Sequence, residues 1–243
     1  MARFFINASD IQSGQVTLTG SNASHARVLR LKAGEQVLLC DGTGMEWICD
    51  VQDSGLDAVT LKVLEERKST SEASVEVHIY MAFPKGDKLE HVIQKATELG
   101  ATKIVAFPSA RCVSRPDEKS LKKKLERWQK IAASAAEQSG RGIVPAVEVL
   151  PSYAKALEQA SKTDLAILFY ENEHATTLRM ALESKSFHSV SLMTGPEGGL
   201  EEKEVDQASE AGLQVCTLGS RILRCETAPL CALSAVMYAA GEF

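Results

Sequence analysis

Residues 75–107 read VEVHIYMAFPKGDKLEHVIQKATELGATKIVAF, and this stretch decides the fold of most of the chain. Its first residues alternate apolar and polar side chains, which is the period of a β-strand. Apolar side chains then recur at helical spacing as far as Gly100, a typical residue at a helix end, and Asp87 and Glu90 have the spacing of a capping box. Lys103–Phe107 is apolar again. A strand, a helix and a second strand in this order predict an α/β unit.

The same alternation of strands and helices continues to the end of the chain. After a long helix with one apolar face over 121–135, we expect strands at 165–170, 189–194 and 213–218 and helices at 174–183, 201–211 and 228–240. This order is typical of an α/β domain with a mainly parallel sheet. The last helix is apolar nearly all round, which predicts burial, in part against a second subunit. Thr227 is in position to cap that helix.

The residues before this stretch follow a different pattern. Short β-rich segments divided by turn residues, with a helical piece over 24–34, predict a compact β-barrel. Its strands are expected at 15–19, 35–40, 47–51 and 58–63. Residues 65–74 are polar and aperiodic, which is typical of a linker. The chain is therefore expected to have two domains, at residues 1–70 and 74–243.

The composition is that of an ordinary globular enzyme, with 44% apolar and 24% charged residues among 243. No apolar run reaches the ~18 residues of a membrane span or resembles the core of a secretory leader, so we expect a cytoplasmic protein without membrane contacts. The six cysteines include no CxxC pair, and the late pair Cys225 and Cys231 has no histidine nearby. No metal site is therefore expected.

The charges are unevenly distributed along the chain. The net charge of −5 argues against a protein that coats nucleic acid through bulk charge. Residues 103–130, however, carry nine Lys or Arg against three Asp or Glu, a local excess of six. Taken alone, such a run is typical of a solvated helix face. It becomes a candidate contact surface if the substrate is RNA.

Two conspicuous loops follow strands that we expect to be neighbours in the sheet. The first is TGPEGGL at 194–200, and the second is LGSRILRCET at 218–227. Ligands of open parallel sheets bind beyond the carboxyl ends of the strands, and glycines let backbone groups approach a ligand closely. Such groups suit a purine edge and an amino-acid zwitterion. The loops lack the GK[ST] of a P-loop, and no GxGxxG follows a strand, which argues against other nucleotide sites.

The same two loops resemble those of a known family. TGPEGGL together with LGSRILRCETAPL at 218–230 strongly resembles the SPOUT class of RNA methyltransferases, and within it the ribosomal RNA small subunit methyltransferase E (RsmE) family. Three further segments agree with that family: SHARVLRLKAG at 24–34, PKGDKLEHVIQKATELGA at 84–101 and KLERWQKIAASAAEQSGR at 124–141. Cys225 and Pro229 depart from it, because Thr is usual at both positions, so neither side chain is expected to be essential.

The resemblance implies a fold, a reaction and partners. The implied fold is an N-terminal PUA-like RNA-binding β-barrel followed by a C-terminal α/β domain whose chain forms a trefoil knot, in a homodimer. The implied cofactor is S-adenosyl-L-methionine (AdoMet), held bent in the knotted loops, and the implied reaction is methylation of N3 of a uridine in 16S rRNA of the small ribosomal subunit. The paired loops alone also fit a SPOUT enzyme for ribose 2′-O or tRNA methylation, or a non-catalytic RNA-binding ribosome-assembly factor. The intact GPEGG and RILR motifs favour an enzyme, because a pure binder needs no cofactor site.

The chemistry of this reaction suggests roles for the loop residues. N3 of uridine is protonated at neutral pH and lies on the Watson–Crick edge, so the base must be unpaired and must lose a proton before or during methyl transfer. A guanidinium would stabilise the negative charge that develops on the base, and we expect Arg224 in this role, with Arg221 as second choice. Glu226 is expected as the general base or as the group that orients Arg224. Cofactor contacts are expected from Phe169, Thr194, Gly195, Pro196, Glu197, Gly198, Gly199, Leu218, Gly219, Ser220, Ile222 and Leu223.

RNA contacts are expected from cations that meet phosphates. Arg27 and Arg30 are three residues apart, which predicts that they share one face of a helix. The candidates in the N-terminal domain are Arg3, His25, Arg27 and Arg30. The candidates in the C-terminal domain follow strand ends and are Lys85, Arg111 and Arg115.

Overall fold

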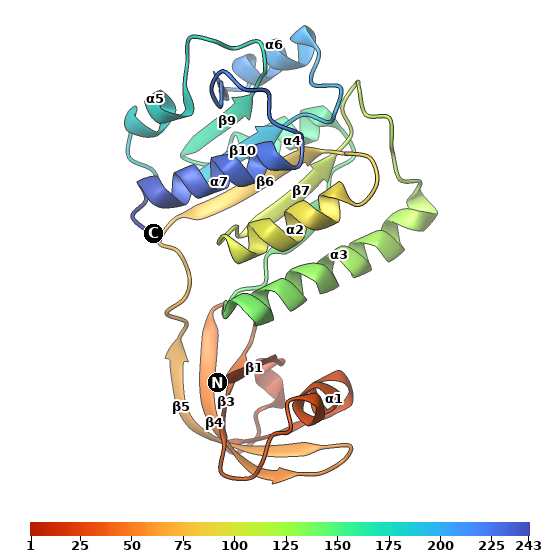
Figure 1. The fold of residues 1–243 in the computed structure, drawn as a ribbon, viewed down its shortest axis with the longest axis vertical. Helices are drawn as coiled ribbons and strands as arrows, with labels where there is room; N and C mark the ends of the chain where they lie inside the picture. The colour runs from red at the N-terminus through yellow and green to blue at the C-terminus, as the bar shows by residue number, and fades with distance from the viewer. The chain divides into compact units, whose positions relative to one another are not determined.

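The computed structural model describes residues 1–243, apart from the side chain of Glu118. The chain divides into two compact units, which are Met1–Glu72 with Ala136–Val144 and Ala73–Ala135 with Pro145–Phe243 (Figure 1). The segment Ala136–Val144 contains the end of a long helix, and the sequence patterns did not indicate that it belongs with the N-terminal residues.

The first unit is built on a curled five-stranded sheet, a half-barrel (Figure 1). Its strands are β1 (Ala2–Phe5), β2 (Gln15–Leu18), β3 (Gln36–Cys40), β4 (Met45–Ser54) and β5 (Val59–Lys68), and it also holds a 3₁₀ helix η1 (Ala8–Asp10) and helix α1 (Gly20–Val28). The strand order is β1-β3-β4-β5-β2, in which β1 pairs with β3 in parallel and the other pairs are antiparallel. Register shifts between β4 and β5 at Ile48/Cys49 and Val51/Asp53 are bulges, which increase the twist of a sheet.

The sheet extends further than the sequence indicated. Glu65–Lys68 belong to β5 and pair with Met45–Ile48 of β4, so the prediction of a linker that begins at residue 65 is wrong for these residues. Strand β1 was not expected either. Main-chain hydrogen bonds hold both segments in the sheet, and these bonds do not depend on the polar side chains that made 65–68 look irregular.

The second unit contains a six-stranded sheet in which every pair is parallel. Its strands are β6 (Glu76–Ala82), β7 (Lys103–Phe107), β8 (Ala146–Val149), β9 (Leu165–Phe169), β10 (Ser189–Thr194) and β11 (Gln214–Cys216). They lie in the order β11-β9-β10-β6-β7-β8. All five residues of β9 are buried, as expected of a sheet that is covered on both faces. The predicted α/β class with a mainly parallel sheet is confirmed.

Helices cover both faces of this sheet (Figure 1). On one face α2 (Lys88–Glu98) packs against α7 (Thr227–Ala239), and on the other α4 (Tyr153–Ala160) and α6 (Glu202–Glu210) share a core with Tyr80, Phe107 and Leu168. The remaining helices are α3 (Glu118–Ser139) and α5 (Leu178–Glu183). In the part of the chain that the structure describes, none of the helices has the length and apolarity needed to cross a membrane.

Two elements of this unit were not expected from the sequence. β8 is short and only partly buried, so its apolar alternation is weak. The side-chain amide of Gln129 holds it in place by donating to the Pro145 carbonyl at 2.9 Å and accepting from the Val147 N–H at 3.0 Å. α4 begins after Ser152, whose Oγ accepts from the Lys155 N–H at 3.2 Å. Both elements depend on polar contacts that apolar periodicity does not reveal.

The two predicted helix caps have different outcomes. Asp87 is the N-cap of α2, as predicted, but within the described residues its side chain makes no capping hydrogen bond. α7 has Glu226, not Thr227, as its N-cap. The reason is that the N–H groups of Thr227 and Ala228 already donate to the Arg224 carbonyl, at 2.8 and 3.0 Å, so Thr227 lies inside the first turn.

Candidate active site

The loops after β10 and β11 do not follow neighbouring strands, which corrects the expectation from the sequence. β9 lies between β10 and β11, because the chain passes from β9 to β10 on one side and then returns to β11 on the other. Such a reversal of strand order opens a crevice at the carboxyl ends of the strands, where open α/β sheets bind ligands. The end of β9 therefore contributes to the site together with the two loops.

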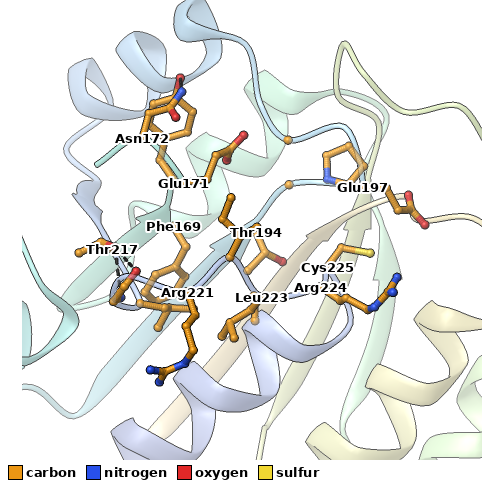
Figure 2. Close-up of a pocket in the computed structure, with 18 of the residues that line it drawn as sticks. Phe169, Glu171, Asn172, Thr194, Glu197, Thr217, Arg221, Leu223, Arg224 and Cys225 are labelled. Carbon is orange, nitrogen blue, oxygen red and sulfur yellow. Dashed lines mark hydrogen bonds between the residues drawn. The ribbon is translucent and has the colours of Figure 1, made fainter. Parts of the chain in front are cut away.

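A cavity of about 650 Å³ lies at this crevice (Figure 2). Its volume is within the ~300–1,000 Å³ that is usual for small-molecule sites. All the residues expected to hold the cofactor line it, and so do Arg221 and Arg224. The cavity is also lined by residues that the sequence did not single out, which are Lys88, Glu171, Asn172, His174, Thr217 and Ala228.

Thr194, which lines this cavity, has a buried hydroxyl without a hydrogen-bond partner among the described residues. The residue ends β10 and is 2% exposed. Its Oγ1 is one of two buried side-chain polar atoms without a hydrogen-bond partner among the described residues, and Figure 2 shows the side chain among those that line the cavity. A buried hydroxyl without a partner costs about 1–3 kcal/mol. A ligand atom that bonds to Thr194 would remove this cost, so the cavity is suited to a polar ligand.

Glycines of the first loop allow close approaches that a side chain would block. Gly199 has a φ of +68°, and a Cβ on it would overlap the carboxylate of Glu171. A Cβ on Gly195 would stand 3.1 Å from Cγ of Leu200. Gly198 faces Arg111 instead, because its Cβ would stand 3.2 Å from the Cβ of that arginine. Gly195 therefore allows the close packing within the loop, and Gly199 allows the close approach to Glu171, which lines the cavity.

Lys88, at the start of α2, connects the two loops. Its Nζ lies 3.0 Å from Oε1 of Glu197 in the first loop and 3.3 Å from Oε2 of Glu226 at the end of the second. The Lys85 N–H also donates to Oε1 of Glu197, at 3.0 Å. The hydrogen bond to Glu197 raises the pKa of Lys88, so its ammonium stays charged. Two carboxylates from different loops are thus held by one cation.

The carboxylate of Glu226 forms hydrogen bonds and an ion pair with neighbouring residues. Burial by itself would raise the pKa of Glu226, but hydrogen bonds with the backbone, Cys225 and Lys88 outweigh burial and lower the pKa. Burial raises the pKa of the Cys225 thiol to about 12, so the thiol is protonated and donates to Oε2 of Glu226 at 3.3 Å. The Glu226 carboxylate is therefore ionised and a weak proton acceptor, and in the described structure it pairs with Lys88 rather than with Arg224.

The two arginines of the second loop carry positive charge that no carboxylate of the described residues neutralises. Both side chains are exposed, and neither forms an ion pair within the described residues. Figure 2 shows that they lie apart, with Arg224 next to Cys225 and Arg221 on the side of Thr217. The backbone of Arg224 is fixed by its two hydrogen bonds to the start of α7. Both guanidiniums line the cavity, and a positive charge there can stabilise an anion that forms in it.

Comparisons with known proteins show the family of the chain. The RNA methyltransferase domain family matches residues 71–237, and the RNA methyltransferase PUA domain family matches residues 18–64. The ribosomal RNA small subunit methyltransferase E of Bacillus subtilis (strain 168) is 39% identical over 98% of this chain and 96% of its own. The chain belongs to the ribosomal RNA small subunit methyltransferase E family.

Solved structures of similar proteins share the fold. The ribosomal RNA small subunit methyltransferase E from Neisseria gonorrhoeae, bound to S-adenosyl methionine, is 34% identical, with a TM-score of 0.84 over 98% of this chain and 97% of that one. A putative methyltransferase from Legionella pneumophila, in complex with the bound cofactor SAM, is 27% identical, with a TM-score of 0.85 over 98% of this chain and 97% of that one.

Two RNA-contact candidates of the first unit are paired with carboxylates. Nη1 of Arg3 lies 2.7 Å from Oε1 of Glu46, and the Arg3 side chain is only 12% exposed. Because Glu46 neutralises it inside the unit, Arg3 is a structural residue rather than a free cation for phosphate. Nδ1 of His25 lies 2.9 Å from Oε1 of Glu137, and the His25 ring packs edge-on against Phe4 with centroids 5.4 Å apart.

Arg27 and Arg30 are exposed, but they do not share a helical face as the sequence had suggested. α1 ends at Val28, and Arg30 has a left-handed φ of +57°. The Leu31 N–H donates back to the Ala26 carbonyl at 3.2 Å, which is the closure expected when a left-handed residue ends a helix. The two guanidiniums therefore project from different backbone conformations.

The three candidates of the second unit are exposed and lie after strand ends, Lys85 beyond β6 and the two arginines beyond β7. Nη1 of Arg111 donates to the Gly198 carbonyl at 3.1 Å, and Nη2 of Arg115 donates to the Ser109 carbonyl at 2.7 Å. Carbonyl groups orient a guanidinium without neutralising it. The backbone N–H of Lys85 and the guanidinium of Arg111 both contact the first loop, so the charge of Arg111 lies next to residues that line the cavity.

The cavity residues that were not predicted differ in how clearly the sequence pattern indicates them. Glu171, Asn172 and His174 are polar residues directly after a fully buried strand, a pattern that is typical of a site at the carboxyl edge of a sheet. Lys88 had no such signal, because one lysine in the first turn of an amphipathic helix is common. Only the folded chain brings it to Glu197 and Glu226.

Proposed function

We propose that this protein transfers the methyl group of AdoMet to N3 of a uridine in 16S rRNA of the small ribosomal subunit. The observation that carries the proposal is the cavity between the two loops, where an unpartnered buried hydroxyl and unneutralised guanidiniums line one crevice. Membership of the methyltransferase family supports the reaction type. The enzyme class is AdoMet-dependent rRNA methyltransferase.

The lining of the cavity fits AdoMet. The Thr194 hydroxyl and the backbone of Gly195–Gly199 and Leu218–Leu223 would bind its polar groups, and Phe169 would form part of an apolar wall. Glu171 adds a carboxylate that suits a ligand with positive charge. When bound, the cofactor supplies an electrophilic methyl group on a sulfonium.

The charge that develops on the substrate explains the proposed role of Arg224. A uracil base that loses the N3 proton becomes negative across O2, N3 and O4, and the base must leave its stack to present this edge. A preorganised guanidinium stabilises such an anion more than it stabilises the neutral base, which lowers the barrier. Arg224 is proposed in this role because it lines the cavity and forms no ion pair among the described residues, and Arg221 is the second candidate.

Glu226 is proposed to hold Lys88 rather than to act as the base. Its lowered pKa makes it a poor acceptor for the weakly acidic N3 proton. Its bond to Lys88, together with the bond from Lys88 to Glu197, ties the second loop to the first. In this proposal Glu226 contributes to the shape of the cofactor site, and water accepts the N3 proton.

We assign RNA binding to both parts of the chain. Residues 1–70 are proposed to form the PUA-like RNA-binding domain, supported by the PUA family match, and residues 74–243 the AdoMet-binding domain with a trefoil knot. The exposed cations Arg27 and Arg30 are proposed to meet phosphates in the first domain. His25 is proposed to contact the RNA beside these two arginines. Lys85, Arg111 and Arg115 are proposed to do so near the cavity.

We also propose that the protein is a cytoplasmic homodimer. α7 buries Leu233, Val236 and Met237 against its own sheet and neighbouring helices, but Tyr238 on the same helix is 75% exposed. Ile222, in the loop before α7, is 85% exposed. Large apolar side chains that one subunit leaves uncovered are the usual core of a two-fold interface.

The test of the proposed function is a single-turnover assay with 16S rRNA and labelled AdoMet, followed by mass spectrometry of the nucleosides. We expect N3-methyluridine as the product. Arg224→Ala should lower the rate about a hundredfold at saturating RNA, with AdoMet affinity nearly unchanged. Arg27→Ala is the control, because a phosphate contact should recover at saturating RNA. A methyl group on ribose, or no methyl transfer by the wild type, would refute the proposal.

A further inference from the structure

The exposed side of α3 carries a concentration of lysines. The helix turns Trp128 and Ala132 inward, where they are 5% and 0% exposed. On the opposite side are the exposed residues that we call the lysine face, which are Lys119, Lys122, Lys123 and Lys130. They extend over about 16 Å of helix at 1.5 Å per residue. The result is a mainly cationic strip on the second unit.

The lysine face has no carboxylate partners in the part of the chain that the structure describes. Glu126 is exposed on the same side of α3, but no ion pair joins it to these lysines. The cation of α3 that forms an ion pair is Arg127, whose Nη2 lies 2.6 Å from Oε2 of Glu90. α4 shows the contrast, because Nζ of Lys155 lies 2.7 Å and Nζ of Lys162 lies 3.9 Å from oxygens of Glu158. In a chain with a net charge of −5, this group of lysines thus forms no ion pair with the carboxylates that the structure describes.

Helix stability does not account for this arrangement. Lys119 and Lys123 are four residues apart, and like charges at this spacing destabilise a helix. Lys119 also lies in the first turn of α3, where the helix dipole disfavours a cation. The positions of Lys119 and Lys123 are therefore unfavourable for the isolated helix, and an anionic partner would offset this cost.

We propose that the lysine face of α3 binds phosphates of the rRNA substrate, as a docking surface separate from the cofactor cavity. This inference rests on the proposed function, because it takes the RNA substrate as the polyanion. Point charges on flexible stems suit phosphates and read no base sequence. An anionic membrane is the less suitable partner, because the apolar residues Trp128 and Ala132 are buried and cannot enter a bilayer.

The experiment compares two variants that lose the same charge. One carries Lys119→Gln, Lys122→Gln and Lys123→Gln on α3. The control carries Lys155→Gln, Lys162→Gln and Lys203→Gln, which are exposed lysines in or next to α4 and α6. Affinity for 16S rRNA transcribed in vitro is measured over a series of salt concentrations. The α3 variant should lose affinity, and its slope of log K against log salt should fall by about 2, which is three contacts at ~0.7 each. The control should match the wild type.

Further measurements distinguish RNA docking on the lysine face from binding to a membrane and from failure of the proposed function. A variant with Arg at the same three α3 positions should keep the wild-type slope, because it keeps the charge. AdoMet affinity and the rate at saturating RNA should not change in the α3 variant. Equal slopes for the α3 variant and the control would overturn the docking surface, as would loss of binding to anionic lipid vesicles with RNA affinity intact. Failure of the wild type to methylate RNA would overturn the proposed function instead.

Discussion

A methyl group at Gly199 should affect both the stability of the protein and its affinity for AdoMet. Gly199 has a φ of +68°, and a non-glycine residue in this left-handed region costs about 1–2 kcal/mol of stability. A Cβ would also overlap the carboxylate of Glu171, which lines the cavity, so that side chain must turn away. Losing one hydrogen bond to a charged group costs about 1.5–3 kcal/mol, which raises the Kd for AdoMet about 10- to 100-fold.

Two further variants separate the effect on stability from the effect on AdoMet affinity. Gly212 has a φ of +90°, and a Cβ added to it would have no heavy atom within 4 Å outside its own chain neighbours, so Gly212→Ala should lose similar stability without losing affinity. Glu171→Gln should lose affinity without the loss of stability. Stability is measured by urea unfolding without ligand, and affinity by calorimetry. If Gly199→Ala and Gly212→Ala bind AdoMet equally well, the reasoning about Glu171 is refuted.

Three other predictions follow from the contacts. Glu46→Gln should destabilise the protein by about 3 kcal/mol, because it leaves the Arg3 charge unpaired in a buried site. Burial alone would raise the pKa of Glu46, but hydrogen bonds from Arg3 and Ser69 lower it. The stabilising contribution of Glu46 is therefore present above its ordinary pKa of 4.5 and is lost as the pH falls. In urea unfolding at a series of pH values, Glu46→Gln should not show this loss of stability at acid pH. Lys88→Met should raise the Kd for AdoMet in calorimetry, and Lys88→Arg should restore much of the affinity. Equal affinity of both variants and the wild type would refute the proposal that Lys88 holds the two loops in place for the cofactor. Tyr238→Glu should shift sedimentation towards the monomer, whereas a wild-type protein that is monomeric at micromolar concentration would contradict the dimer.

The fold class could be predicted because buried apolar residues recur along the sequence at the period of the strand or helix that contains them. The strand and helix patterns of residues 75–107 report which faces are apolar, and the structure has β6, α2 and β7 there. β8 and α4 could not be predicted in this way. β8 is only partly buried, and its hydrogen bonds to Gln129 join residues that lie far apart in sequence.

The residues of the cavity could be predicted in large part because they lie in two short glycine-containing loops. Loops at strand ends must meet at one edge of a parallel sheet, whichever strands they follow. The order of the strands could not be predicted, since periodicity says which residues are buried but not which strands are neighbours. The position of β9 between the two loops, and with it Glu171 in the cavity, was therefore missed.

The sequence by itself determined the class of the sheet, the two loops and the family, because each depends on local periodicity or on a contiguous motif. Only the tertiary structure decided which charges are available. Arg3 and Arg224 look alike in the sequence, but Arg3 is neutralised by Glu46, whereas Arg224 has no carboxylate partner among the described residues. Lys88 likewise gains its role from Glu197 and Glu226, which only folding brings to it. A charge acts through its distance to other charges, and that distance is set by packing rather than by spacing along the chain.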